Sequence, residues 1–287
     1  MHISKECYLC IYNQVFKITQ RLSLDESKAS LVLREGAKIL SKYDLTYMPP
    51  VIAAEVYERI SEILGIEDLF EKEKKEAIKE ALKFKKILTK RIQKSKDLLF
   101  DSAKVAVGGN VIDLGVNQDY NLEKEIKNIF EIEFFKNDFD EFRDKLKSAK
   151  KVCYLADNAG ENVFDEIFIE EIKKYNSDVK IYYLVRGRPI INDVTVKDLE
   201  GLEIWDLAEV VDSGVPSPGF CLPYANEKSK EIFYDSDLVI SKGMGNFECL
   251  FGECGREVFY FFKVKCEVVA RAVESRVGNY MIFKGEK

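Results

Sequence analysis

Histidine is almost absent from this sequence, which contains a single one, His2, beside the first methionine. A Ser–His–Asp or Cys–His mechanism needs an imidazole held inside the site, and histidine zinc sites need one too. A residue next to a chain end is rarely held in place. We therefore exclude histidine-based chemistry, which leaves carboxylates, lysines, thiols and a metal held by oxygen atoms.

Secretion signals and long apolar runs are lacking as well. The first ten residues include Lys5 and Glu6 and no extended apolar segment of the kind that opens a signal peptide. No apolar run approaches the roughly 20 residues of a membrane helix. We expect a soluble cytoplasmic protein without a membrane partner. Its 7 cysteines are by default free thiols, and a disulfide stays open as the alternative. Cys7 and Cys10 form one Cys-x-x-Cys pair, for which a second metal site, a redox site and simple burial stay open.

A basic surplus is also missing, since the formal net charge is −6. Nucleic-acid binding requires basic surface that releases counterions, so we expect no nucleic-acid partner. Charged residues make up 33% of the chain, a proportion typical of proteins from hot environments, where surface ion-pair networks are favoured. The hydrophobic fraction of 46% suffices for a sizeable core. The oligomeric state stays open.

Helical periodicity dominates the first hundred residues and predicts an all-helical N-terminal domain over residues 1–100. The supporting signals are apolar spacing over 4–18, a capping-box pattern of Ser23 with Glu26, prolines 49 and 50 before a segment that ends at Gly65, and a Lys/Glu-rich amphipathic stretch over 68–96.

Alternating strands and helices characterise residues 101–287. We expect strands at 152–156, 179–185, 202–205, 238–240 and 258–264, and helices at 122–147, 161–174 and 226–234. This alternation indicates an α/β fold, a Rossmann-like, mostly parallel sheet with helices on both faces. Ligands bind such sheets at the carboxyl ends of the strands, so the residues after each strand are the candidates for a site.

Oxygen donors follow two of these strands. Asp157 and Asn158 come directly after the first, and Asp193 lies in the loop after the second. Two carboxylates and an amide suit a hard cation such as Mg²⁺ or Mn²⁺. Each of these positions taken singly is more typical of a helix N-cap than of a metal ligand, so their convergence in space carries the metal hypothesis.

Glycine-containing turns supply a candidate phosphate site. Lys242 offers a point charge after the strand at 238–240, and glycines let the backbone approach a phosphate closely. The start of the helix at 161 adds unpaired N–H groups that favour an anion. The residues expected to line this site are Lys242, Gly243, Gly245, Asn246, Ala159, Gly160, Glu161 and, from a fourth loop at 108–113, Asn110.

Three segments together, 157–161, 185–193 and 241–248, resemble the damage-control phosphatase family, also known as DUF89. The segment 109–113 and the Cys-x-x-Cys opening extend the resemblance along the chain, and the latter is similar to the prokaryotic and archaeal branch. The resemblance implies a divalent metal (Mn²⁺, Co²⁺, Ni²⁺ or Mg²⁺) on Asp157, Asn158 and Asp193, a phosphate-binding lysine at Lys242, and hydrolysis of sugar phosphates or similar, often damaged, metabolites.

The residues agree with a metal-dependent phosphomonoester hydrolase in which Asp157 and Lys242 act catalytically. Whether Asp157 is a nucleophile, a general base or only a ligand stays open. Two alternatives remain. A SAM-dependent carboxyl methyltransferase also begins with a strand and an acidic, glycine-containing loop, although residues 157–162 hold only one glycine. A non-catalytic metabolite-binding protein would bind the ligand without turnover.

Overall fold

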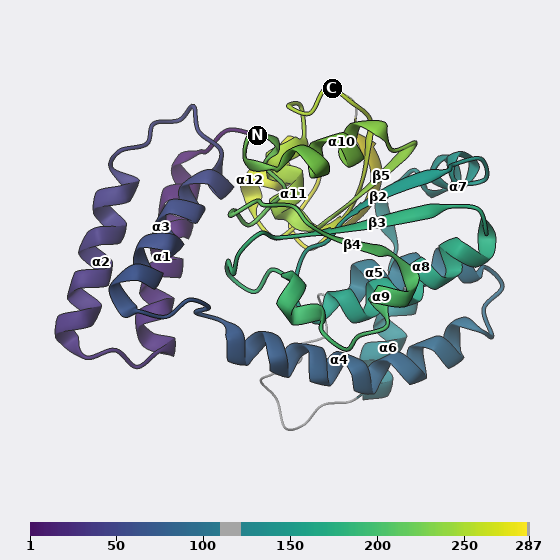
Figure 1. Cartoon of the computed structure of the whole chain (residues 1–287), viewed down its shortest axis with the longest axis horizontal. Helices are drawn as coiled ribbons and strands as arrows, with labels where there is room; N and C mark the ends of the chain where they lie inside the picture. Colours follow the sequence, from purple (N-terminus) through teal and green to yellow (C-terminus); the bar gives the residue numbers. More distant parts are fainter. Residues whose placement is uncertain (110–121, 286–287) are drawn as a thin grey trace.

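A computed structural model describes residues 1–109 and 122–285. These residues form a seven-stranded sheet in the order β1-β7-β6-β5-β2-β3-β4 (Figure 1). β2 to β6 are parallel, while β7 runs antiparallel to β6 and parallel to β1. The strands are β1 (Phe134–Asn137), β2 (Lys151–Leu155), β3 (Lys180–Val185), β4 (Glu209–Asp212), β5 (Leu238–Lys242), β6 (Val258–Lys263) and β7 (Tyr280–Gly285).

Helices cover both faces of the sheet, which confirms the predicted Rossmann-like architecture (Figure 1). On one face lie α5 (Leu98–Gly108), α7 (Phe139–Leu146), α8 (Glu161–Tyr175) and α9 (Ile204–Leu207). On the other lie α10 (Glu227–Asp235), α11 (Gly243–Leu250) and α12 (Glu267–Ala272). The long helix α4 (Glu71–Ile92) forms an outer layer against α5 and α8, beside α6 (Leu122–Phe130).

Alternation along the strands divides the core in two. In β2, Val152 and Tyr154 face the layer of α5, α7 and α8, whereas Cys153 and Leu155 face α10 and α11. Successive side chains of a strand point to opposite faces, so a strand buried on both sides must be apolar throughout. This is why the central strands read as continuous hydrophobic runs.

The first three helices form a separate cap beside the sheet (Figure 1). They are α1 (Lys5–Arg21), α2 (Glu26–Leu40) and α3 (Pro49–Leu64). Their apolar faces share a cluster of their own, to which Ile190 of the loop after β3 also belongs. α3 begins at Pro49 and ends before Gly65, whose φ of +65° terminates the helix as expected.

The domain division at residue 100 stays a prediction. The hydrophobic clusters group α1–α3 by themselves and place α4 with α5 and α8.

Most predicted elements of the α/β part are confirmed within one to three residues, but the helix expected over 122–147 is wrong. α6 ends at Phe130, the edge strand β1 follows, and α7 begins at Phe139. The side chain of Asn137 accepts a hydrogen bond from Phe139 N at 3.2 Å, which supports the start of the new helix. β1 pairs with β7, a strand that the sequence analysis missed.

Two further expectations are corrected. The segment 202–205 is not a strand, because Ile204 opens α9 and Trp205 Nε1 donates to the Leu199 carbonyl at 2.9 Å, while the strand follows as β4. The capping residue of α2 is Asp25 rather than Ser23. The Asp25 side chain accepts from Lys28 N, and Ser23 occupies a turn with φ of +47°.

Two remaining expectations concern membranes and thiols. In residues 1–109 and 122–285, every helix is too short or too polar to cross a membrane. Cys221 and Cys249 form a disulfide, the alternative to the default of free thiols that the sequence left open. The disulfide joins the loop before α10 to α11. Cys7, Cys10, Cys153, Cys254 and Cys266 are free.

Candidate active site

Asp157, Asn158 and Asp193 converge at the point where the strand order reverses. β2 lies between β3 and β5, and the chain leaves β2 toward one side and enters β5 on the other. Such a switch point opens a crevice at the carboxyl ends of the strands. Asp157 and Asn158 follow β2, Asp193 lies in the loop after β3, and Gly243 follows β5.

Backbone hydrogen bonds tie the loops after β2 and β3 together. Val194 N donates to the Asp157 carbonyl at 2.9 Å, and Ala159 N donates to the Asn192 carbonyl at 2.8 Å. Asn158 and Asp193 thereby form an isolated antiparallel bridge. The proximity of the predicted metal ligands thus follows from main-chain pairing rather than from long side chains.

Gly243 completes this corner because its backbone lies directly against Asp157. With φ of +75°, a Cβ atom at this position would lie 2.0 Å from Asp157 Oδ2. Only glycine leaves room for the carboxylate in this backbone conformation.

The two carboxylates are buried and repel each other. Asp157 is 8% exposed and Asp193 3%. Burial, followed by the negative charge of Asp193, raises the pKa of Asp157 to about 6. Burial also raises the pKa of Asp193, against the lowering effect of Arg186.

Arg186 neutralises this pair only in part. Its Nε donates to Asp193 Oδ2 at 2.7 Å, while one terminal nitrogen lies 3.9 Å from Asp157 Oδ1. That terminal nitrogen has no hydrogen-bond partner among the described residues. One arginine therefore faces two acids, and the local surplus of negative charge favours a further cation.

The amide of Asn158 has one chemically sensible orientation. Its Nδ2 donates to Asp157 Oδ2 at 2.8 Å and to Glu161 Oε1 at 2.7 Å. The flipped amide would aim its oxygen at two carboxylates, which the hydrogen-bonding pattern forbids. The side-chain oxygen of Asn158, Oδ1, is consequently left for another partner.

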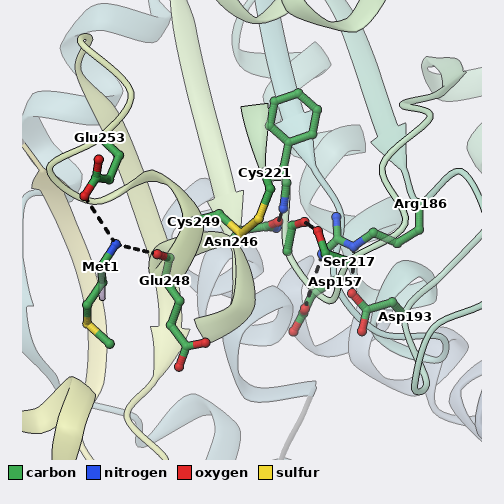
Figure 2. The surroundings of a disulfide bond; sticks show 12 residues. Met1, Asp157, Arg186, Asp193, Ser217, Cys221, Asn246, Glu248, Cys249 and Glu253 are labelled. Carbon is green, nitrogen blue, oxygen red and sulfur yellow. Dashed lines mark hydrogen bonds and ion pairs between the residues drawn. A yellow bond between two sulfur atoms is a disulfide. The ribbon is translucent and has the colours of Figure 1, made fainter. Parts of the chain in front are cut away.

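Asp157, Asn158 and Asp193 line a cleft of about 520 Å³ between the cap and the sheet. Figure 2 shows the carboxyl groups of Asp157, Asp193 and Glu248 directed to the same side. The opposite wall belongs to α1 and α3 and includes Ile11, Pro49 and Pro50. The other residues that line the cleft include Cys7 and Cys10 of α1 and, from the side of the sheet, Asn158, Gly245, Lys265 and Cys266.

The predicted phosphate lysine, Lys242, is buried behind the cleft. It is 1% exposed, and its Nζ donates to Asp165 Oδ1 and to the Ala106 carbonyl, both at 2.7 Å. Burial by itself lowers its pKa, but the charges of Asp165 and Glu161 outweigh this effect and raise it.

Asn246 also lies away from the cleft. Its Nδ2 donates to the backbone carbonyls of Ala156 and Lys242 at 3.0 and 2.7 Å, and its Oδ1 accepts from Phe220 N at 2.7 Å. The side chain fastens the ends of β2 and β5 to the loop before α10. Asn110 lies outside the described residues.

The start of α8 offers little to an anion. The N–H groups of Ala159, Gly160 and Glu161 donate to Asn192 O, Asn162 Oδ1 and Asn158 O. The first turn of α11 differs, because Met244 and Gly245 line the cleft and the first N–H groups of a helix have no intrahelical acceptor. The anion-binding expectation is therefore better supported for Gly245 than for residues 159–161, while Gly243 lies against Asp157 and is not among the residues that line the cleft.

Cys7 and Cys10 face the same cleft rather than a site of their own, with Cys266 on the wall beside them. Among the described residues, three or more His, Cys, Asp or Glu side chains nowhere come together in a way that could hold a metal. A second metal at this pair stays a prediction. The Asp157, Asn158 and Asp193 set combines two acids with an amide.

Lys265 was missed by the sequence analysis. It follows β6, lines the cleft and is exposed. Its positive charge lowers the pKa of Asp157 more than Arg186 or Lys242 does. The strand-end rule that selected Asp157 would have found it if it had been applied to β6.

Comparison with known proteins adds independent findings. The model of the damage-control phosphatase ARMT1-like domain matches residues 3–281. A damage-control phosphatase from Pyrococcus horikoshii is 30% identical over 288 residues, which cover 100% of this chain and 99% of the relative. A damage-control phosphatase from Archaeoglobus fulgidus is 30% identical over 285 residues, which cover 97% and 98%. The crystal structure of a DUF89 family protein from Pyrococcus horikoshii has a TM-score of 0.93 and 29% identity, with both chains covered completely.

Glu248 yields a test of the electrostatics of the cleft. Burial, together with the charge of Asp157, raises its pKa to about 7. In metal-free protein, the folded state then holds a proton between about pH 4.5 and 7 that the unfolded state has released, so the stability falls as the pH rises through this window. Glu248→Gln should flatten this decline, measured by urea unfolding at several pH values.

The matched control is Glu227→Gln, since the Glu227 side chain is 91% exposed. It should leave the wild-type slope unchanged. An unaltered slope in Glu248→Gln would contradict the assigned environment.

Proposed function

Because this chain belongs to the damage-control phosphatase family, we propose that it is a divalent-metal-dependent phosphatase that hydrolyses small phosphorylated metabolites. The observation that carries the proposal is the convergence of Asp157, Asn158 and Asp193 at the switch point of the sheet, in a cleft that also contains Lys265. The relatives' names support phosphatase activity. The metal and the class of phosphate ester are our inference.

The donor set fits a hard cation. Two buried carboxylates with raised pKa values and one amide oxygen would hold Mn²⁺, Mg²⁺, Co²⁺ or Ni²⁺. The surplus negative charge that Arg186 leaves uncompensated supports this assignment. Such a cation supplies polarisation of a phosphoryl oxygen and activation of water.

The phosphoryl group would be bound on the side of α11. Among the described residues that line the cleft, Lys265 is the one lysine or arginine. Its backbone N–H donates to Met244 Sδ at 3.1 Å, which ties its loop to the first turn of α11. The ammonium group and the N–H groups of that turn would stabilise charge on the phosphoryl oxygens. Lys242, buried behind the cleft, would stabilise the negative charge of the phosphoryl group through its electric field rather than by direct contact.

Hydrolysis of p-nitrophenyl phosphate and sugar phosphates with Mn²⁺, Co²⁺, Ni²⁺ or Mg²⁺ tests the function directly. EDTA should abolish turnover. Asp157→Asn and Asp193→Asn should each lower kcat by roughly a hundredfold or more, because several kcal/mol of transition-state stabilisation depend on the cation.

Asp178→Asn serves as the control, since Asp178 is a surface carboxylate paired with Lys150. Full turnover in either site variant, or turnover unaffected by EDTA, would exclude the metal assignment. Metal binding without turnover of any ester would indicate a metabolite-binding protein instead.

Gly243→Ala tests the contact between the α11 turn and Asp157. The new methyl group must displace the Asp157 carboxylate, so metal-dependent activity should fall at least tenfold. Gly252→Ala is the matched control, because Gly252 has nearly the same φ, +76°, and nothing within 4 Å of the added methyl group. Both variants should lose about 1 kcal/mol of stability from the left-handed backbone, but only Gly243→Ala should lose activity, as measured by steady-state kinetics. Equal activities would refute the contact.

Lys265→Ala tests the phosphate contact. Loss of one charge-assisted hydrogen bond, about 1.5–3 kcal/mol, should raise KM at least tenfold and weaken inhibition by inorganic phosphate. Lys263→Ala is the control, since Lys263 Nζ lies over the Tyr280 ring at 5.1 Å. It should keep the wild-type KM. An unchanged KM in Lys265→Ala would assign the phosphate contact elsewhere.

A further inference from the structure

A buried polar network lies directly behind the candidate metal ligands, and its centre is Asp165 on α8. Asp165 is fully buried, and its Oδ1 accepts hydrogen bonds from Tyr154 OH at 2.6 Å and from Lys242 Nζ at 2.7 Å. Its Oδ2 accepts from Tyr183 OH at 2.8 Å. The two tyrosines extend from β2 and β3, the strands that lead into the loops of the site. Asp165 is thus held by three donors from three neighbouring strands.

Lys242 continues the network toward the cleft. Its ammonium group has three N–H donors, and three acceptors surround it: Asp165 Oδ1, the Ala106 carbonyl at 2.7 Å and Glu161 Oε2 at 3.5 Å. The ammonium position is therefore defined from all sides. Glu161 accepts from Lys242 through Oε2, and its other oxygen, Oε1, points toward Asn158.

Asn158 is the last member. Glu161 Oε1 accepts from Asn158 Nδ2, which also donates to Asp157 Oδ2. A continuous chain of polar contacts therefore runs from Asp165 through Lys242 and Glu161 to two of the proposed metal ligands. Hydrogen bonds of this kind fix the orientation of ligating groups and commonly alter metal affinity 10- to 100-fold.

We propose that Asp165 is a positioning residue, which acts through Lys242 and Glu161 to aim the amide oxygen of Asn158 and the carboxylate of Asp157 at the cation. The inference rests on the proposed function for its purpose, but the geometry can be tested without it. If the charge of Asp165 is removed, Glu161 becomes the nearest remaining anion for Lys242. The ammonium should then move toward Glu161 and draw its carboxylate away from Asn158.

The rival explanation is that Asp165 only stabilises the fold as one partner of a buried ion pair. The chain contains a matched pair that separates the two explanations. Glu166, the next residue on α8, is equally buried and binds Lys85 at 2.7 Å. Its other oxygen accepts from Ile204 N at 3.0 Å, so its contacts lead to α4 and α9 rather than to the cleft.

The experiment compares Asp165→Asn with Glu166→Gln. Crystal structures of the metal-free variants should show Lys242 and Asn158 displaced in Asp165→Asn and unmoved in Glu166→Gln. By isothermal titration, the Kd for Mn²⁺ should rise at least tenfold in Asp165→Asn and by less than twofold in Glu166→Gln, although both lose stability. With an active wild type, kcat should follow the Mn²⁺ affinity.

Tyr154→Phe/Tyr183→Phe is the second variant, to be used if Asp165→Asn fails to fold. It keeps the charge of Asp165 but removes both O–H donors. The less compensated carboxylate should draw Lys242 toward itself and away from Glu161, with a smaller loss of Mn²⁺ affinity. Unmoved Lys242 and Asn158 side chains in the variant that folds would overturn the inference. So would an Mn²⁺ affinity equal to that of Glu166→Gln.

The proposed function fails separately from this inference. If the wild type hydrolyses no phosphate ester with any metal, the function is refuted, but the crystallographic comparison still decides whether Asp165 positions Asn158. If the wild type is an active phosphatase and the two variants behave alike, the positioning role alone is refuted.

Discussion

The site depends on the burial of two like charges close to each other. Asp157 and Asp193 would separate if their loops were free, since burial and mutual repulsion both disfavour the charged pair. The backbone hydrogen bonds between the two loops prevent this separation. Main-chain pairing costs little further entropy once the strands are ordered. The sheet thus maintains a local electrostatic strain that a bound cation would relieve.

How far the fold could be predicted depended on where each strand lies in the sheet. The interior strands β2, β3 and β5 are apolar on both faces, and their hydrophobic runs identified them. β1 and β4 lie at the edges and have four residues each. Half-exposed, short strands carry polar residues and resemble loops or helix ends. The segment around Phe134 accordingly gave a helical signal.

The site was predictable where strand ends determine it and unpredictable where tertiary partners do. Asp157, Asn158 and Asp193 were predicted as one group because neighbouring parallel strands end at the same edge, and they do lie together. Lys242 also ends a strand, yet it is buried because Asp165, distant in sequence, pairs with it. A lysine's exposure depends on such partners, and no local pattern encodes them. For the same reason Lys265 was overlooked, although it occupies the open position.

The separate core of the cap bears on how such a protein diversifies. The chain passes from α1–α3 to the rest of the molecule once, between Leu64 and Glu71. One wall of the cleft therefore comes from a helical unit with its own packing, and the opposite wall bears the acids. Substitutions at Ile11 or Ala53 can reshape the space for an incoming molecule while the spacing of the carboxylates stays untouched. Substrate recognition, determined by the wall from the cap, can then change in evolution without altering the catalytic groups on the opposite wall.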